Sequence, residues 1–315
     1  MPHAFRNVLV TGGAGFVGSN LVRRLLPISE HIIVIDDCST SKPSALPVSN
    51  KITFMKQSYV SDELLENVLG DIQHIYHLAC RNLEMSVQNT DDDFHVNLYG
   101  GYLLLKKAME KSRHLQRFVY TSTASVYGNA SVLPTPESEY DTTTPYAASK
   151  LSVEHYCRVF HRMHQLPVTV LRLSNAYGPG QLTSNPYCGV IAKFFEAAAG
   201  GLPLTVFGDG SQTRDFTYIE DVIEALLLAG ISPAAVGGVF NVGTGVETSV
   251  NRLAELVLQI AGRPKTQTQF SPKRKVDVVT RRCLNSDLLQ YTLGWKAKTT
   301  LEEGLERTYR WLNGG

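Results

Sequence analysis

The chain has 315 residues, of which 43% are hydrophobic, so it can bury one large core or two smaller ones. Its 30 basic and 29 acidic residues leave a formal net charge of +1 and are spread along the whole length, which gives no electrostatic case for binding nucleic acid or an anionic membrane. No stretch is apolar for long enough to span a bilayer, so we expect no membrane partner.

The cysteines are scattered, odd in number and without the paired spacing of a zinc site or a disulfide framework; they are Cys38, Cys80, Cys157, Cys188 and Cys283. This usage fits a reducing compartment and predicts no metal site. The sequence enters the apolar run at residues 8–10 almost at once, which leaves no room for a cleavable signal sequence. We therefore expect a cytoplasmic protein.

Six short β-rich runs alternate with amphipathic segments from the start of the chain to residue 172. The runs are NVLVT (7–11), HIIVID (31–36), ITFMKQ (52–57), HIYHLA (74–79), RFVYTS (117–122) and VTVLRL (168–173). Such alternation is typical of an α/β fold, and we expect a Rossmann-type doubly wound parallel sheet with helices on both faces. Residues 1–172 are predicted to form this first domain.

After residue 172 the rhythm loosens into loops rich in Gly, Pro and Asn. The helical stretches between the loops are GVIAKFFEAAAG (189–200), IEDVIEALLLAG (219–230), SVNRLAELVLQIAG (249–262) and TLEEGLERTYRWL (300–312). We expect residues 173–315 to form mainly a smaller C-terminal substrate-binding lobe, with some segments, such as GGVFNVG (237–243), returning to the main sheet.

Three glycines lie where the first strand runs into the first helix, in TGGAGFVGSN. Gly12 can make the tight turn, Gly15 lets the backbone approach a pyrophosphate, and Gly18 lets the helix pack close to the strand. The start of the helix, with Phe16 and Val17, then directs its free N–H groups at the phosphates. The pattern predicts that a dinucleotide binds at this turn.

The second strand, HIIVID, ends in Asp36, about twenty residues beyond the glycine turn. A carboxylate there can accept hydrogen bonds from the adenosine ribose hydroxyls and would repel a 2′-phosphate. No arginine follows Asp36 directly to reverse that preference. The expected cofactor is therefore NAD rather than NADP.

Tyr146 and Lys150 stand four residues apart in PYAASKLSVEHY, on one face of a predicted helix. A phenol has an ordinary pKa of about 10, but a nearby ammonium and a positive nicotinamide ring both favour the phenolate, which can act as a base. Upstream, the strand RFVYTS ends in the hydroxyl run Thr121, Ser122 and Thr123, at the sheet edge where α/β folds bind ligands. We predict that Tyr146 and Lys150 are catalytic together with a hydroxyl of this run. His77 and His155 are expected to be structural.

These motifs resemble those of the extended short-chain dehydrogenase/reductase superfamily, particularly its nucleotide-sugar epimerases and dehydratases of the UDP-glucose 4-epimerase type. The resemblance covers nearly the whole chain and rests on TGGAGFVG, the segment Leu78, Ala79 and Cys80, then Asn97, TSTASVYG, YAASK, LRLSNAYGPG, VFGDGSQTRDFTYIEDV and the late LGW. It implies that Tyr146 is the base, that Lys150 also holds the nicotinamide ribose, and that Thr123 hydrogen-bonds the sugar oxygen being oxidised. It places Leu78, Ala79 and Asn97 at the cofactor.

The resemblance also predicts how a nucleotide sugar is held. It implies that Asn175 lies at the substrate and that Arg214 and Arg274 lie near the nucleotide diphosphate; guanidinium groups match phosphate oxygens bidentately. Arg281 falls where decarboxylating relatives carry an arginine near the sugar, so an acidic sugar is one option, and an arginine on a solvated strand is the other. A homodimer through helices around residues 94–111 and 146–164 is expected from the resemblance alone.

The chain also departs from the family pattern. Ser58 stands where many relatives place an acid near the adenine, and Lys275, Val276 and Asp277 replace the common Gly-Asp step after the second arginine. In the resembling dehydratases an Asp-Glu pair follows the catalytic hydroxyl, and decarboxylating relatives carry a Glu there, whereas this chain has Ala124 and Ser125.

Without a second acid–base group, water elimination lacks its proton shuttle. The sequence therefore favours epimerisation at C4 of a UDP-hexose or UDP-hexuronate through a transient 4-keto sugar. An NAD(P)H-dependent keto-sugar reductase is the nearest alternative. A dehydratase or decarboxylase of a nucleotide sugar, or a non-catalytic dinucleotide-binding module, is a more distant one.

Overall fold

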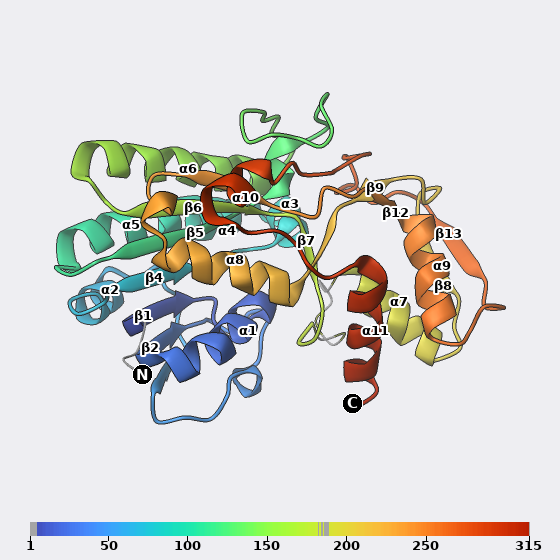
Figure 1. The fold of residues 1–315 in the computed structure, drawn as a ribbon, viewed down its shortest axis with the longest axis horizontal. Coiled ribbons are helices and arrows are strands. Elements are labelled where there is room, and N and C mark those ends of the chain that lie inside the picture. Colours follow the sequence, from blue (N-terminus) through green and yellow to red (C-terminus); the bar gives the residue numbers. More distant parts are fainter. Residues whose placement is uncertain (1–4, 182, 184, 186–188, 315) are drawn as a thin grey trace.

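A computed structural model describes residues 5–181, 183, 185 and 189–314. Its centre is a seven-stranded parallel sheet in the order β11-β6-β5-β4-β1-β2-β3 (Figure 1). The strands are β1 (Phe5–Thr11), β2 (Ser29–Ile35), β3 (Ile52–Met55), β4 (His74–His77), β5 (Arg117–Thr123), β6 (Val168–Leu173) and β11 (Val239–Val242). All six predicted runs form strands of this sheet. The predicted Rossmann-type α/β fold is confirmed.

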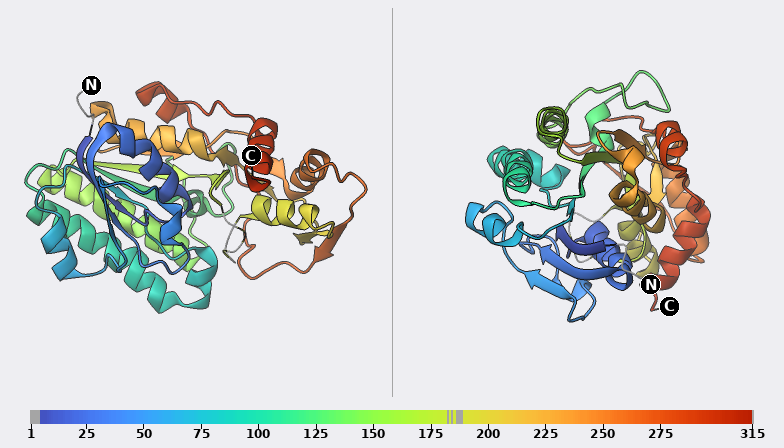
Figure 2. Two further views of the ribbon diagram at one scale, coloured as in Figure 1. Left: turned by 90° about the horizontal axis from the view of Figure 1, so that it is seen from below. Right: turned by 60° about the vertical axis from the view of Figure 1, so that its left-hand side comes forward.

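Helices cover both faces of the sheet (Figure 2). One face carries α1 (Phe16–Leu25) and α8 (Ile219–Ile231), and the other carries α2 (Asp62–Val68), α5 (Gly100–Lys111) and α6 (Pro145–His164). Because side chains alternate along a strand, Val8 and Val10 enter the hydrophobic cluster beneath α1 and α8, whereas Leu9 enters the cluster beneath α5 and α6. Strands buried on both faces explain the nearly continuous apolar runs of the sequence.

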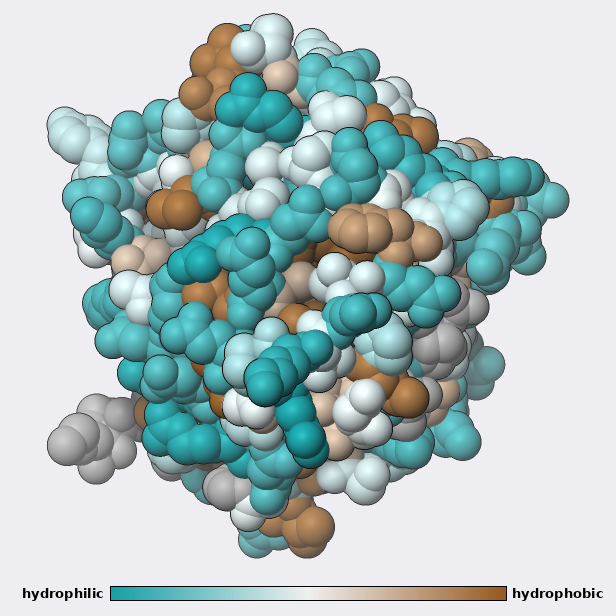
Figure 3. Space-filling view, turned by 90° about the vertical axis from the view of Figure 1, so that its right-hand side faces the viewer, coloured by the Kyte–Doolittle hydropathy of each residue, from teal (hydrophilic) through white to brown (hydrophobic). Residues whose placement is uncertain are grey.

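The C-terminal half builds a smaller lobe at one end of the sheet. There β8 (Leu204–Phe207) pairs in parallel with β13 (Thr268–Ser271), and α7 (Val190–Ala199), α9 (Val250–Ile260) and α11 (Leu301–Leu312) pack around this pair. The end face of this lobe mixes hydrophilic and hydrophobic side chains (Figure 3). Among the described residues, none of the helices is long and apolar enough to cross a bilayer.

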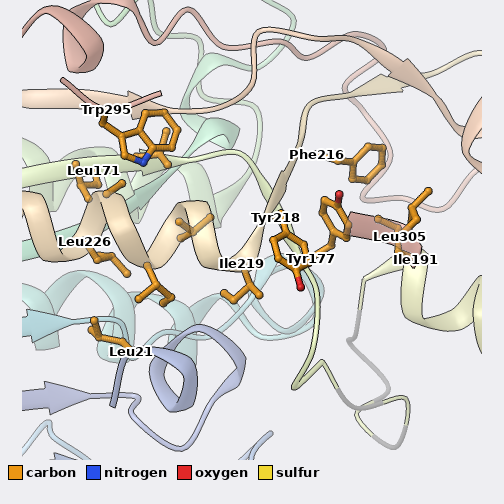
Figure 4. Close-up of a cluster of buried hydrophobic side chains, with 14 of the residues drawn as sticks. Leu21, Leu171, Tyr177, Ile191, Phe216, Tyr218, Ile219, Leu226, Trp295 and Leu305 are labelled. Atoms are coloured by element: carbon orange, nitrogen blue, oxygen red, sulfur yellow. The ribbon is translucent and has the colours of Figure 1, made fainter. Parts of the chain in front are cut away.

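The hydrophobic core continues from the sheet into the smaller lobe (Figure 4). The link is made by β7 (Asn175–Tyr177), which pairs in parallel with β10 (Phe216–Tyr218). The ring of Tyr177 packs edge-on against Tyr218, with ring centroids 5.6 Å apart. The segment GGVFNVG contributes β11, which pairs with β6 at the edge of the main sheet. The two-domain division at residue 172 stays a prediction, since a single core spans that point.

The strand order reverses between β1 and β4, the two strands from which the sheet grows in opposite directions. In open α/β sheets, ligands bind in the crevice outside the carboxyl ends of the strands at such a reversal. Here Thr11 ends β1 and His77 ends β4, and the Thr11 hydroxyl bonds His77 Nδ1 at 2.7 Å. The topology therefore places the site where these strand ends meet.

Candidate active site

The glycine turn is built by close backbone contacts that side chains would prevent. Gly12 adopts φ +70°, and a Cβ on it would lie 2.6 Å from the backbone nitrogen of Ala79. A Cβ on Gly18 would lie 2.2 Å from the carbonyl oxygen of Gly12, so only glycine lets α1 start this close to the turn. At Gly15 the nearest atom, Gly12 O, is 3.2 Å away, and no side chain caps the helix there. The first N–H groups of α1 are thus left for a ligand.

A cavity of about 550 Å³ opens in front of this turn. Its lining contains every predicted cofactor residue near the turn, namely Gly12, Gly15, Phe16, Val17, Gly18, Asp36, Leu78 and Ala79. Ser58 also lines it, at the position where an acid was expected in relatives. Asn97 does not line the cavity; it accepts a hydrogen bond from Arg81 N at 2.7 Å and donates to Arg81 O at 2.9 Å. Asn97 thus shapes the cavity wall from behind.

Asp36 is buried and already hydrogen-bonded. Its carboxylate accepts from Ala14 N at 3.0 Å, Cys38 N at 2.8 Å and the Ser41 hydroxyl at 2.8 Å. The first of these bonds ties the second strand to the glycine turn. Asp36 therefore orders the cavity in addition to the ribose contact predicted for it.

The sequence did not single out Arg81, which also lines the cavity. Its guanidinium pairs with Asp37 at 2.8 Å and with Asp92 at 2.6 Å. Two carboxylates balance this cation, so it offers no free charge for the 2′-phosphate of NADP. The sequence could not reveal the pairing of Arg81 with Asp37, because the two residues lie 44 positions apart.

Tyr146 lies near the start of α6, beside the cavity that Cys80 lines. Its phenol interacts with the Thr123 hydroxyl and with the Cys80 thiol. Burial raises the pKa of the Tyr146 phenol well above its ordinary value. The phenol thus needs a positive neighbour to act as a base at neutral pH. The contact with Cys80 was not predicted, although the thiol belongs to one of the motifs.

Lys150 lies one turn further along α6 and is almost fully buried. Its ammonium donates to the carbonyl oxygen of Thr121 at 2.7 Å and lies 4.7 Å from the centre of the Tyr120 ring. Burial lowers the pKa of Lys150. The structure therefore brings Thr123, Tyr146 and Lys150 to one place, with the ammonium held by the strand end rather than by the phenol.

The two histidines lie in structural settings. His77 is buried at the end of β4 against Thr11, and burial lowers its pKa well below the ordinary value. His155 lies on α6, with its ring beside that of Tyr140. Within the described part of the chain, no group of three or more His, Cys, Asp and Glu side chains is placed to hold a metal ion. The four described cysteines are free thiols, and Cys188 lies outside the described residues.

Three of the predicted substrate residues lie on the side of the smaller lobe. Asn175 begins β7, and its side-chain oxygen is buried without a hydrogen-bond partner. Arg214 ends β9 (Thr213–Arg214), and burial lowers its pKa. Arg274 pairs with Asp277 at 2.9 Å and with Glu84 at 2.5 Å, so its charge is balanced before any diphosphate binds. The segment 181–189 that follows β7 lies partly outside the described residues.

Two neighbouring arginines have opposite surroundings. The side chain of Arg281 is 62% exposed, pairs with Glu247 and lines a small surface hollow with Asn129 and Thr280. Arg282, by contrast, has a buried Nε without a hydrogen-bond partner and interacts electrostatically with Tyr146 and Arg214. Arg281 was the residue predicted near the sugar, and Arg282 was missed, because a run of two arginines in an irregular segment does not reveal which side chain points inward.

The positions after Thr123 carry no acid. Ala124 and Ser125 are buried at the start of a short 3₁₀ helix (Ala124–Tyr127), and Ser125 N donates to the Thr123 hydroxyl at 3.1 Å. This bond fixes the hydroxyl at the end of β5 as the cap of the 3₁₀ helix. The arrangement offers a phenol and hydroxyls, the groups that hydride chemistry at a carbinol carbon requires.

The sequence profile of the NAD dependent epimerase/dehydratase family matches residues 8–243. The chain belongs to this family. Among curated relatives, UDP-glucose 4-epimerase of Mycolicibacterium smegmatis is 36% identical over 310 residues, which cover 95% of this chain and 96% of the relative. dTDP-glucose 4,6-dehydratases match as well. Membership in the epimerase/dehydratase family makes the chain an NAD-dependent enzyme and leaves its specific reaction open.

Solved structures of epimerases share the fold over almost the whole chain. UDP-glucose 4-epimerase from Thermotoga maritima, with UDP-glucose, superposes with a TM-score of 0.91 at 36% identity and covers 98% of this chain and 99% of its own. UDP-glucuronic acid 4-epimerase from Bacillus cereus, in complex with UDP-glucuronic acid and NAD, superposes with a TM-score of 0.88 at 28% identity, with coverages of 98% and 99%.

NAD is the cofactor of this family, and the cavity of this chain fits it. The uncapped N-terminus of α1 faces the cavity, and the space beside Gly12 and Gly18 is too narrow for any side chain. We expect the turn to hold the pyrophosphate, Asp36 the adenosine ribose, and the region of Cys80 and Tyr146 the nicotinamide end.

Proposed function

We propose that this enzyme is an NAD-dependent nucleotide-sugar 4-epimerase that acts on a UDP-hexose or UDP-hexuronate. The observation that carries the proposal is the interaction of Tyr146 with the Thr123 hydroxyl and with Cys80, which lines the cofactor cavity. Ala124 and Ser125 follow Thr123 in place of acids. This set can move one proton to and from a sugar hydroxyl. It has no second group placed to take a proton from a neighbouring carbon.

The chemistry expected of each side chain follows from its position. Tyr146 takes the proton of the C4 hydroxyl and later returns it, while Thr123 hydrogen-bonds the same oxygen. NAD, when bound, supplies the acceptor and donor of the C4 hydride. Lys150 holds the phenol end of α6 against Thr121 and favours the phenolate through its charge. If the 4-keto sugar rotates in the site before the hydride returns, the hydride adds to the opposite face of C4 and the configuration at C4 inverts.

The names of relatives support this proposal. The M. smegmatis relative is named UDP-glucose 4-epimerase, and the T. maritima epimerase was solved with UDP-glucose. We further propose that Asn175 contacts the sugar and that Arg214 and Arg274 hold the diphosphate. For Arg281, predicted near the sugar, we propose the alternative of a solvated arginine, because it pairs with Glu247 at the surface.

The proposal is tested with UDP-, dTDP-, GDP- and CDP-sugars, with products identified by NMR. The cognate UDP-sugar should yield a mixture of C4 epimers without steady accumulation of NADH. In heavy water no deuterium should enter C5. Stoichiometric release of NADH would point to a dehydrogenase or reductase, and deuterium at C5 together with loss of the 6-hydroxyl would identify a dehydratase.

The alternative functions differ in what they ask of the cofactor. A keto-sugar reductase would exchange NAD(P)H freely during turnover, whereas an epimerase keeps its NAD bound through many cycles. A non-catalytic dinucleotide-binding module would bind NAD and leave every sugar unchanged. Retained NAD in the purified protein, together with epimer formation, favours the proposed epimerase over both.

We also propose a cytoplasmic homodimer. Helices α5 and α6 pack side by side, and the segments 94–111 and 146–164 leave exposed hydrophobic side chains on the outside: Phe94, Tyr99, Tyr156, Val159 and Met163. A second copy covering this face would remove them from water. Light scattering should give twice the monomer mass, and Met163→Lys should shift the protein toward monomer. A monomeric wild type would contradict the proposal.

A further inference from the structure

Arg282 differs from the three arginines that were predicted at the substrate. Arg214 donates to Thr213 O at 2.7 Å, Arg274 pairs with Asp277 and Glu84, and Arg281 pairs with Glu247. The guanidinium of Arg282 makes no hydrogen bond or ion pair within the described residues, and its Nε is buried. A buried cation without a partner is unfavourable unless a ligand supplies the counter-charge.

The backbone on both sides of Arg282 is held in place. Thr280 O accepts from Thr213 N at 2.9 Å, and Cys283 O accepts from Thr135 N at 2.8 Å. Leu284 N donates to the buried carboxylate of Asp215 at 3.1 Å. The guanidinium is therefore presented by a fixed segment, as a preorganised binding group would be.

The charges around Arg282 link it to two parts of the proposed site. Burial, with a smaller contribution from the positive charge of Arg214, lowers the pKa of Arg282 to about 9, whereas Tyr146 opposes this shift. Arg282 remains a cation at neutral pH. It interacts electrostatically with both the arginine proposed for the diphosphate and the phenol proposed for the C4 hydroxyl.

Given the proposed 4-epimerase, on which this step rests, we infer that Arg282 binds a carboxylate carried by the sugar and that the substrate class is a nucleotide hexuronate. The sugar spans the distance between its diphosphate, at C1, and the C4 oxygen at Tyr146. A C6 carboxylate is attached to C5, the carbon next to C4, and so lies in this span. A guanidinium pairs with a carboxylate through two parallel charge-assisted hydrogen bonds.

A neutral hexose would leave the guanidinium of Arg282, with its buried Nε, without a counter-charge. Its 6-hydroxyl could accept a hydrogen bond but brings no negative charge to balance Arg282 beside Arg214. The carboxylate of a hexuronate supplies both the hydrogen-bond acceptors and the negative charge. The same charge also favours the phenolate of Tyr146 over the neutral phenol.

The test compares ligands and neighbouring arginines. The NAD-loaded protein carries Tyr146→Phe, so that ligands are not turned over, and calorimetry measures the affinities for UDP, UDP-glucose and UDP-glucuronate. Arg282→Gln is compared with Arg281→Gln, which removes the same charge one residue away, and with Arg282→Lys. Thermal unfolding checks that each variant is folded.

We expect UDP-glucuronate to bind more tightly than UDP-glucose. Arg282→Gln should weaken the binding of UDP-glucuronate by about ten- to a hundredfold, since a charged hydrogen-bonded contact is worth that much. The affinities for UDP and UDP-glucose should change by less than about threefold. Arg282→Lys should restore part of the loss, and Arg281→Gln should keep the preference for UDP-glucuronate.

Three outcomes would overturn the inference. If Arg282→Gln weakened the binding of UDP and of both UDP-sugars equally, Arg282 would be a ligand of the diphosphate. Tighter binding of UDP-glucose than of UDP-glucuronate would exclude a carboxylate contact. If only Arg281→Gln weakened the binding of UDP-glucuronate, the contact would belong to Arg281. Failure of the proposed function is seen separately. A wild type that prefers UDP-glucuronate but forms no C4 epimer would contradict the epimerase and support the carboxylate contact.

Discussion

Two charged side chains that line the cofactor cavity are bonded before any ligand arrives, whereas two polar groups on the substrate side have no partner. Asp36 accepts three hydrogen bonds, and Arg81 is neutralised by two carboxylates. On the other side, Asn175 Oδ1 and Arg282 Nε are buried and unbonded. The difference suits a cofactor that stays bound through turnover and a substrate that completes its own site each time it enters.

The largest expected effect lies where the two regions meet. Tyr146→Phe should lower turnover by at least about a hundredfold, because general base catalysis typically contributes that much or more, and NAD binding should be unchanged. Burial raises the pKa of Tyr146, so the wild-type rate should increase with pH as the phenol loses its proton. The residual rate of the variant should lack this rise. Steady-state kinetics across pH measure the rates, and fluorescence titration measures the affinity for NAD. Near-normal activity of Tyr146→Phe would show that Tyr146 is not the base.

On the substrate side, Arg214→Ala should raise KM by about tenfold or more, the worth of a charge-assisted contact to groups remote from the reacting carbon. The value of kcat should fall as well if that contact also positions the sugar. The variant should retain NAD as the wild type does, because Arg214 belongs to the substrate side and not to the cofactor half. An unstable protein with unaltered KM would instead make Arg214 a structural residue.

In the cofactor half, Gly18→Ala should lower the free energy of unfolding by about 1–3 kcal/mol, because its Cβ would overlap the backbone of Gly12 and force the helix away. Gly15→Ala is the matched control, since its Cβ meets nothing closer than 3.2 Å. It should retain stability and lose NAD affinity if the pyrophosphate lies there. Chemical denaturation and NAD titration distinguish the two. Equal stability of both variants would contradict the packing argument.

The smallest expected effect concerns the choice of dinucleotide. Asp36→Ala should weaken NAD binding by a few-fold and narrow the gap to NADP, since the carboxylate that repels a 2′-phosphate is gone. Asp37→Ala is the comparison, because that carboxylate pairs with Arg81. Titration with both cofactors measures the preference. If it does not change in Asp36→Ala, the ribose contact lies elsewhere.

The elements of the sheet and its glycine turn could be read from the sequence because they depend on neighbours in the chain. Six apolar runs became the six predicted strands, and the long helices fell within a few residues of their patterns: α7, α8, α9 and α11. Gly12 and Gly18 obey steric rules set within a single strand–helix unit. Asp36 could be placed at the cavity because it ends the next strand of the same unit.

The charge balance of the site could not be predicted, because it depends on partners far apart in the sequence. Arg81 meets Asp37 across 44 residues, and Arg274 meets Glu84 across 190. For Arg281 and Arg282, residues 213–215 and Thr135 hold the segment and decide which guanidinium turns inward. The sequence alone determined the fold class, the cofactor turn and the hydroxyls of Thr123 and Tyr146, which follow from local periodicity and motif spacing. Only the tertiary structure decided which arginine turns inward, since the direction of a side chain in an irregular segment is set by the packing around it.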